Sequence, residues 1–590
     1  MAGAPEGSCR PLGDGADAPG PLIVPLRNQT LAGELRAEHD PRLARRRRSE
    51  ALPRVLPTAS LQRRHAAPRE HGLPALRGAR VSRTKLAAAH YGTRLVLTGA
   101  TLVLGFIATP LVLGWLGAER FGAYRVLVEW LGWLTLLELG IGNSLQPLMS
   151  SALALDDRAK TSHVLRAGVR AYIGVAVAQA VALAVFVVVV PRLVPVSGPL
   201  VPDLIRAVLV SGAALLLVPV VPFRVLAEVS QRGWLVHTLL LVQGLASTGA
   251  ALFCAHAGWG IAGQALAAVA GQVPLSIGLA VVGLIRFPDL AHRLFLGAVP
   301  RETWREIRRL NWPAFAVTFS GRLGLLSDNL LVGFLLGPAA VTPFQLTQRL
   351  ASVAQVQLQG IGGATWAGLA EVHARGEIDL FRVRLLELTR LVAILGIAVL
   401  VPIAAWSRPF VGIWVGAENF GGELLTITAA AVALLHPVFS LWGWCFMSTG
   451  KPEPLVPVAV AVTGVNLACS VLLTLWIGLP GPVLGTIVSF VAVNAWALPL
   501  QLRRGFGVEP LPLAKAILAP LALGVPYAVL AWLLVQARPP TDWLELAVEM
   551  AALPPLFLAA AFFVVMGGDE RRRYIARARY LIARSTGATA

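Results

Sequence analysis

Long apolar stretches recur from about residue 95 to residue 566, and short polar segments separate them. Each stretch holds roughly 20 mostly apolar residues, enough for one α-helix to cross about 30 Å of hydrocarbon. Helices are expected because lipid offers no hydrogen-bond partners to open strand edges. The pattern predicts about 14 transmembrane helices, at residues 95–116, 122–146, 169–190, 203–223, 234–255, 261–285, 312–335, 342–369, 386–406, 423–447, 454–477, 481–501, 516–536 and 544–566.

The basic residues of the short loops alternate between the two sides of such a bundle. Every second loop is rich in Lys and Arg, whereas the remaining loops hold only Arg120, Arg192, Arg408 and Arg538. Loops rich in Lys and Arg stay in the cytoplasm. The alternation therefore predicts that both termini are cytoplasmic, since one missed span would reverse every loop after it.

An internal repeat relates the second predicted span to the eighth. A forward shift of 220 residues places Leu116-Gly117 on Leu336-Gly337, and Gly140-Ile141-Gly142 on Gly360-Ile361-Gly362. Six spans separate the two copies, so both run in the same direction across the membrane. This arrangement is typical of two parallel lobes related by an axis along the membrane normal.

The predicted fold class is an all-α polytopic membrane protein, with two pseudo-symmetric six-helix lobes and two C-terminal helices. Residues 1–90, rich in Pro, Arg, Ala and Gly, are typical of a disordered tail, and its run of arginines leaves contact with anionic lipid open. The expected divisions are a basic cytoplasmic tail at 1–90, a first lobe at 91–285, a cytoplasmic amphipathic linker at 286–311, a second lobe at 312–502, appended helices at 503–566 and a basic cytoplasmic tail at 567–590.

Composition supports a membrane protein and gives no sign of an enzyme. The apolar share is 56% and the charged share 14%, against about 25% charged residues in soluble proteins. The net charge of +19 lies in loops and tails, which favours an orientation signal over nucleic-acid binding. No two of the four cysteines form a CxxC pair, and neither HExxH nor a P-loop occurs. We therefore expect no cofactor and no metal site.

Ionisable residues inside the predicted spans are candidates for function, because a charge in hydrocarbon is costly and usually faces a cavity or a partner. They concentrate in the second, seventh and eighth spans, where the two lobes would meet. We predict substrate-binding roles for four of them and coupling or gating roles for two. The first group is Arg125, Glu129, Arg322 and Arg349, and the second is Glu138 and Asp328.

Each of these assignments has a structural alternative. The 220-residue shift places Glu129 on Arg349, so the two are expected to pair or to face each other across a central cavity, or else only to lock two helices together. The guanidinium of Arg322 suits a phosphate or diphosphate, unless it pairs with Asp328 or another helix. Glu138 is expected to carry a coupling proton or cation, or to orient an arginine, unless it is simply paired.

Two segments carry a family resemblance. They are LGAERFGAY at 116–124 with LELGIG at 137–142, and SDNLLVGFLLG at 327–337 with Phe344 and Arg349-Leu350. Over residues 90–505 the chain resembles the polysaccharide transporter (Wzx-type O-antigen flippase) branch of the multidrug/oligosaccharidyl-lipid/polysaccharide (MOP) exporter superfamily. Glu138 stands where such families often have Asp, and Phe344 stands at the position equivalent to Tyr124.

The resemblance implies a V-shaped bundle that works by alternating access. Its substrate would be a polyprenyl-diphosphate-linked oligosaccharide, flipped from the cytoplasmic to the periplasmic leaflet of a bacterial inner membrane for surface polysaccharide biosynthesis. Arginines would hold the diphosphate while the lipid tail stays in the bilayer, and an ion gradient is one possible driving force. Membrane lipids, a polysaccharide polymerase and glycosyltransferases are the implied partners.

Other functions stay open on sequence alone. A peptidoglycan lipid-precursor flippase and a cation-coupled multidrug exporter would share the fold. The latter prefers acidic cavities, whereas arginines and acids are equal in number among the six central residues. From other classes, an integral-membrane glycosyltransferase or polymerase usually carries long soluble loops with catalytic acids, whereas the outer loops here are short. A membrane scaffold without transport would leave the intramembrane charges without a purpose.

Overall fold

The computed structural model describes residues 83–155, 157–230, 233–286, 297–309, 311, 328–449, 453–568 and 570–576. Within these ranges the chain is helical and contains no β-strand. Eleven spans in this part are long and apolar enough to cross a membrane. The chain is therefore an all-α, multi-pass membrane protein, as the hydropathy pattern predicts.

The described part up to residue 286 contains α1 (Arg83–Leu116), α2 (Ala118–Leu134), η2 (Thr135–Glu138), α3 (Ile141–Ala154), α4 (Arg158–Leu193), η3 (Gly198–Leu200), α5 (Val201–Gly212), η4 (Ala213–Val220), α6 (Val221–Val229), α7 (Gly233–His256) and α8 (Gly260–Arg286). Of the predicted 1–90 tail, residues 1–82 lie outside the described residues. The last part of that segment belongs to α1, because a membrane helix can continue past the hydrocarbon into the polar interface.

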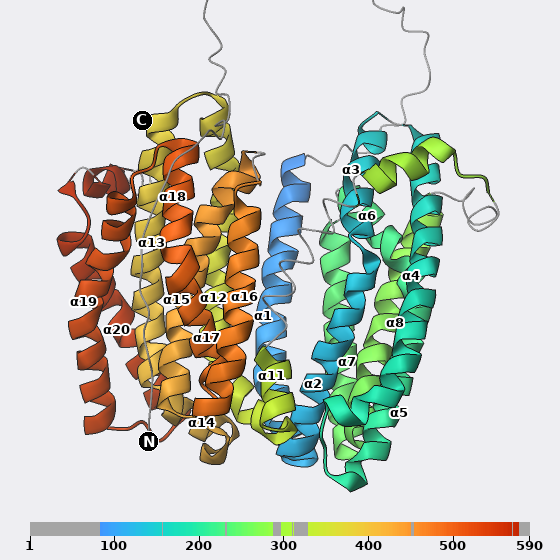
Figure 1. Cartoon of the computed structure of the whole chain (residues 1–590), viewed down its shortest axis with the longest axis horizontal. Coiled ribbons are helices and arrows are strands. Elements are labelled where there is room, and N and C mark those ends of the chain that lie inside the picture. Colours follow the sequence, from blue (N-terminus) through green and yellow to red (C-terminus); the bar gives the residue numbers. More distant parts are fainter. Residues whose placement is uncertain are drawn as a thin grey trace, which may run out of the picture. The chain divides into compact units, whose positions relative to one another are not determined.

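The part from residue 328 onward contains α11 (Asp328–Leu335), α12 (Pro338–Ala374), α13 (Ile378–Ala405), α14 (Ser407–Val415), η5 (Ala417–Asn419), α15 (Glu423–Ser448), α16 (Leu455–Ile477), α17 (Gly481–Ser489), the π-helical turn η6 (Phe490–Asn494), α18 (Ala495–Phe506), α19 (Pro510–Ala537) and α20 (Trp543–Val564). Figure 1 shows α1 between the helices that precede residue 290 and those that follow residue 330.

Three predicted spans differ from one long apolar helix. The span at 122–146 is divided among α2, η2 and α3. In the span at 312–335, residues 312–327 lie outside the described residues. The eighth span lies within α12, which at 37 residues is long enough to cross the membrane but carries Gln and Arg side chains in its central part. These three spans hold the predicted site residues. Their charged and polar side chains make the spans less apolar than the others.

Helix boundaries repeat along the chain at an interval of about 220 residues, as expected for duplicated lobes. Helices α2, α4 and α8 begin at residues 118, 158 and 260, and helices α12, α13 and α17 begin at 338, 378 and 481. Gly117 and Gly337 precede α2 and α12 with nearly the same backbone angles, φ 78° and ψ 162° against φ 92° and ψ 158°. Glycine is the residue that reaches this region without strain. The repeat therefore extends from matching residues to matching backbone geometry.

The two copies differ at one conspicuous point. In the first copy, Leu139 (φ 49°) and Gly140 (φ 77°) adopt left-handed conformations between η2 and α3. In the second copy, the equivalent residues lie within the uninterrupted helix α12. The side-chain amide of Gln179 donates a 3.0 Å hydrogen bond to the carbonyl of Leu134, just ahead of the break. Side chains of a neighbouring helix thus satisfy backbone groups near the interruption, as a bend inside a membrane requires.

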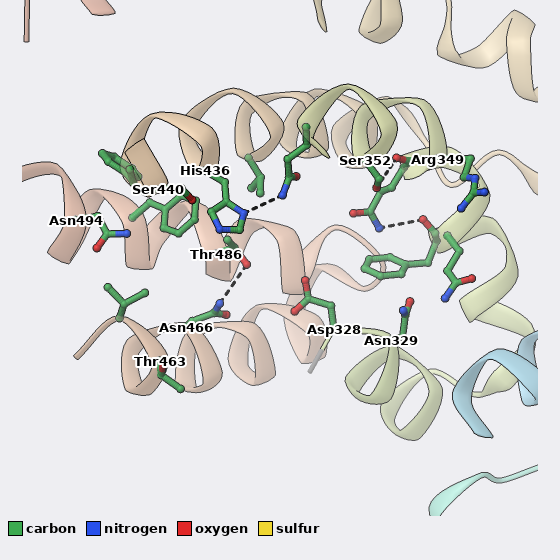
Figure 2. A pocket seen from close by; sticks show the side chains of 18 of the residues that line it. Asp328, Asn329, Arg349, Ser352, His436, Ser440, Thr463, Asn466, Thr486 and Asn494 are labelled. Carbon is green, nitrogen blue, oxygen red and sulfur yellow. Dashed lines mark hydrogen bonds between the residues drawn. The ribbon is translucent and has the colours of Figure 1, made fainter. Parts of the chain in front are cut away.

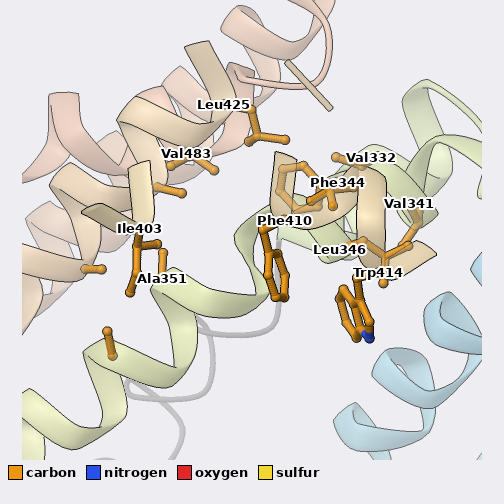
Figure 3. Close-up of a cluster of buried hydrophobic side chains, with 14 of the residues drawn as sticks. Val332, Val341, Phe344, Leu346, Ala351, Ile403, Phe410, Trp414, Leu425 and Val483 are labelled. Atoms are coloured by element: carbon orange, nitrogen blue, oxygen red, sulfur yellow. The ribbon is translucent and has the colours of Figure 1, made fainter. Parts of the chain in front are cut away.

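Helix α2 packs closely against α11 and α12, and this contact joins the two copies. A Cβ on Gly122 would lie 1.8 Å from the carbonyl oxygen of Pro338. The hydroxyl of Thr342 donates a 2.8 Å hydrogen bond to the carbonyl of Ala118. Buried apolar side chains continue the contact into the second copy, including Val332, Phe344 and Trp414 (Figure 3). The region where the lobes were expected to meet is therefore a tightly packed helix interface.

Helices α19 and α20 lie against α13 (Figure 1). The Tyr527 hydroxyl donates a 3.0 Å hydrogen bond to the carbonyl of Ala398. The indole of Trp406, which is fully buried, donates a 2.7 Å hydrogen bond to the carboxylate of Glu549. Buried polar groups are satisfied in this way, so the appended pair is fixed to the second copy by specific contacts.

The described part of the predicted linker contains a helix at residues 301–309. It buries Ile307 in a cluster with side chains of α3, α4 and α6, and exposes its arginines. Lys160 and Glu306 form an ion pair at 3.3 Å. This helix therefore lies on the first copy with its apolar face inward.

Candidate functional site: a polar cavity between helices

A cavity of about 830 Å³ lies among α1, α2, α11, α12 and α14 to α18 (Figure 2). Two kinds of polar residue line it. Charged residues come from α2, α11 and α12, and uncharged hydrogen-bonding residues come from α12, α15, α16 and the α17–α18 region. Figure 2 shows the labelled charged residues, Asp328 and Arg349, toward one end, and Ser440, Thr463 and Asn494 toward the other.

Arg125 and Arg349 both line the cavity, as the sequence predicts for a substrate site. The Nε of Arg125 donates a 2.5 Å hydrogen bond to the side-chain oxygen of Gln345. Gln345 and Arg349 are four residues apart on α12 and therefore share one face of that helix. The two guanidinium groups thus lie on neighbouring surfaces of the same cavity.

Arg349 lies against α1. Its Nη2 is 3.0 Å from the place that a Cβ on Gly105 would occupy. Among the described residues, Arg349 has no hydrogen bond or ion pair that would neutralise its charge. A guanidinium on a cavity wall within a membrane protein, without a carboxylate partner, is well suited to an anion.

Glu129 contacts Asn329 instead of Arg349. The side-chain amide of Asn329 donates a 3.0 Å hydrogen bond to the Glu129 carboxylate. Asn329 and Asp328 line the cavity, whereas Glu129 is not among the described residues that line it. Glu129 therefore fixes the side chain of Asn329 across the interface of α2 and α11 without lining the cavity itself.

Glu138 lies apart from the cavity, at the end of η2. The Tyr172 hydroxyl donates a 3.3 Å hydrogen bond to its carboxylate. This places Glu138 beside the break before α3. Arg322, the remaining predicted site residue, lies outside the described residues.

The comparisons with known proteins agree with this architecture. Residues 91–367 match a sequence family described as "Polysaccharide biosynthesis protein". No curated protein sequence matches the chain at a significant level. Among solved structures, the chain is similar to the lipid II flippase MurJ in an inward closed conformation. The identity is 12% and the TM-score 0.63, over 81% of this chain and 98% of MurJ.

A second similar structure is an inward-facing multidrug resistance MATE family transporter of the MOP superfamily. The identity is 15% and the TM-score 0.53, over 74% of this chain and 96% of that chain. Both likenesses are likenesses of fold, and the family match covers residues 91–367 of the chain. Of these two structural neighbours, one is described as a flippase and the other as a multidrug resistance transporter.

Sequence reasoning missed the uncharged end of the cavity. His436 forms a 2.8 Å hydrogen bond with the side chain of Gln355 and lines the cavity. Asn466 donates a 3.3 Å hydrogen bond to Thr486 across the same wall. A signal was present in α12, where polar residues recur every three or four positions on one face. They are Gln345, Gln348, Ser352 and Gln355.

Proposed function

We propose that this chain flips a polyprenyl-diphosphate-linked oligosaccharide from the cytoplasmic to the periplasmic leaflet by alternating access, for surface polysaccharide biosynthesis. The observation that carries the proposal is the pair of arginines, Arg125 and Arg349, on the walls of one cavity. Asp328 is the one carboxylate among the described residues that line it. Planar guanidinium groups donate paired hydrogen bonds to phosphate oxygens, so the charged end suits a diphosphate.

The uncharged end suits a sugar. Its hydroxyl and amide groups both donate and accept hydrogen bonds, as sugar hydroxyls require. Phe344, Phe439 and Phe490 add aromatic surface to the same cavity. A cavity with one charged end and one neutral polar end therefore matches a ligand that carries both a diphosphate and an oligosaccharide. The family description, polysaccharide biosynthesis, supports the same class of substrate.

The remaining assignments complete the proposal. Arg322 adds a third guanidinium to the headgroup site, and Glu129 orients Asn329 toward the cavity. Glu138 and Asp328 serve coupling or gating. The protein lies in a bacterial inner membrane with both termini in the cytoplasm, and works beside a polymerase and glycosyltransferases.

A lipid II-type precursor is the second candidate substrate. The similarity to MurJ favours it, and its headgroup also combines a diphosphate with sugars. A cationic drug fits less well, because two arginines line the cavity and repel cations.

A flipping assay in proteoliposomes tests the proposal and separates the two lipid substrates. Arg349→Ala is expected to lower the flipping rate of a labelled polyprenyl-diphosphate oligosaccharide about tenfold or more, the cost of one charge-assisted hydrogen bond. Arg349→Lys should retain part of the rate, because it keeps the charge but not the planar fork. Arg375→Ala is the matched control, since Arg375 is an exposed arginine at the end of the same helix.

Three outcomes contradict the proposal. Equal rates for Arg349→Ala and the native protein would remove the headgroup role. Flipping of lipid II but not of other polyprenyl-diphosphate oligosaccharides would favour the second candidate. Transport of a cationic drug with no flipping of either lipid would make the chain an exporter.

A further inference from the structure

A second hollow, of about 610 Å³, lies apart from the central cavity, at the end of the bundle where α2 begins. It is enclosed by the first turn of α2, the start of α5 and the turn between α7 and α8. The residues that line it are Arg120, Pro199, Leu200, Asp203, Arg206, Leu209, Val210, Gly258, Trp259, Gly260, Ala262, Gly263 and Leu266. None of them lines the central cavity.

Two arginines in this hollow are available to a ligand. Within the part of the chain that the structure describes, neither Arg120 nor Arg206 has a hydrogen bond or an ion pair. The carboxylate of the hollow, Asp203, is already engaged, because its oxygens accept hydrogen bonds from the amides of Ile261 at 2.7 Å and Ala262 at 3.2 Å. The positive charge of the two guanidinium groups is therefore not cancelled by direct pairing.

The duplicated fold supplies an internal comparison. The 220-residue shift places Ala340 at the position of Arg120, Thr426 at that of Arg206, and Leu479 at that of Trp259. Thr426 is buried and hydrogen-bonded within the second copy. The same backbone plan is thus built without either arginine, so Arg120 and Arg206 are not needed to form the helix ends at which they lie.

Exposed aromatic side chains place this end of the bundle at the membrane interface. Trp115, Phe253 and Trp259 are all exposed, at the end of α1, the end of α7 and the α7–α8 turn. Phe253 and Trp259 pack edge to face with ring centroids 6.0 Å apart. Aromatic belts of this kind mark the headgroup level of a bilayer.

Apolar side chains continue from the arginines toward the hydrocarbon. Leu209 on α5 is 59% exposed and Leu266 on α8 is 39% exposed. Leu209 lies three residues beyond Arg206 and Leu266 lies seven residues beyond Trp259, so both are farther from the helix ends. The hollow therefore offers positive charge at headgroup level and an apolar wall below it.

We propose that this hollow binds an anionic phospholipid of the surrounding leaflet, with its phosphate between Arg120 and Arg206 and its acyl chains along Leu209 and Leu266. Basic pockets between transmembrane helices recognise lipid headgroups by this combination of charge and apolar contact. The site is independent of the central cavity and does not rest on the proposed flippase activity.

Native mass spectrometry of the full chain released from detergent tests the site. Titration with phosphatidylglycerol is expected to give a retained adduct, and titration with phosphatidylcholine is expected to give none. The double variant R120A/R206A should bind phosphatidylglycerol about thirtyfold more weakly, because each of the two arginines contributes about 1 kcal/mol near the surface. R120K/R206K should restore part of the binding, which a purely structural role of the arginines does not predict.

The double variant R192A/R408A is the matched control, since both arginines are exposed at the same end of the bundle and neither lines the hollow. It should bind like the native protein. Equal loss in this control, or retention in R120A/R206A, would overturn the proposal. Tighter binding of undecaprenyl phosphate or of inorganic phosphate than of phosphatidylglycerol would overturn the assignment of the ligand.

Discussion

Gly122 is a point at which helices α2 and α12 come into backbone contact. A methyl group there would meet the carbonyl oxygen and carbon of Pro338, at 1.8 and 2.7 Å. Backbone atoms cannot rotate aside as a flexible side chain can, so the helices themselves would have to separate.

Gly122→Ala is therefore expected to destabilise the protein by roughly 1–3 kcal/mol, the usual cost of overpacking. Gly114→Ala is the control, because no atom lies within 4 Å of the added group. Thermal unfolding of the purified protein in detergent measures both. Equal melting temperatures for the two variants would mean that the interface is looser than described.

At the residue scale, sequence reasoning selected charges better than it selected their partners. Arg125 and Arg349 stand out in apolar spans because a charge within hydrocarbon is costly unless it faces a cavity or a partner. Both line the cavity. Glu129 was expected to face Arg349, but it contacts Asn329, a neutral residue 200 positions away in the chain. Neutral amides give no signal of their own in a hydropathy pattern, so such a partner emerges only from the fold.

At the scale of elements, the break between η2 and α3 distinguishes the two copies. Both carry Gly-Ile-Gly, so the glycines alone do not cause it. The position of Glu138 is occupied by Leu358 in the second copy, where it is 6% exposed in the apolar core. A straight helix would carry the carboxylate into the equivalent apolar position, which is costly. The break instead leaves Glu138 beside the Tyr172 hydroxyl.

Gly140→Ala tests whether the break depends on a left-handed backbone. Because an L-residue in this conformation costs about 1–2 kcal/mol, the variant should unfold at a lower temperature. Gly360→Ala, at the equivalent position inside the continuous helix α12, has open space around the new methyl group and should be neutral or slightly stabilising. A matching decrease in both variants would contradict this explanation.

The hydropathy pattern predicted a bundle of membrane-spanning helices but not this interruption. The second span reads as one apolar stretch at 122–146, because hydropathy is insensitive to φ. The structure divides the same stretch among three elements. Leu139 is the one non-glycine residue with positive φ in the described chain. Leucine rarely adopts a left-handed conformation, so its residue type does not predict one.

At the scale of the whole molecule, the loops assign a direction to the bundle. The positive-inside rule predicts that Gly198 lies on the periplasmic side and Glu377 on the cytoplasmic side. Both residues are exposed. In a background without native cysteines, a membrane-impermeant maleimide should label Gly198→Cys in intact cells. It should label Glu377→Cys only after the membrane is opened, and the reverse pattern would invert the proposed orientation.

The duplication was visible in the sequence at a single pair of spans, whereas the structure extends matching helix boundaries through α8 and α18. Small and apolar residues replace one another freely in a lipid-facing helix, so residue identities fade. Helix lengths are held by the thickness of the bilayer and therefore persist. This is why the repeat of helix positions could be predicted while most cavity-lining residues could not.

The hydrogen bond from Arg125 to Gln345 joins equivalent positions of the two copies, 220 residues apart, so it lies on their pseudo-two-fold axis. If the two halves were identical in sequence, the residue at this position would contact its own equivalent. Twin arginines repel one another in a poorly screened interior, whereas twin glutamines hydrogen-bond. The present pair is unlike, one side chain cationic and the other neutral, so the two copies differ at the point where they meet.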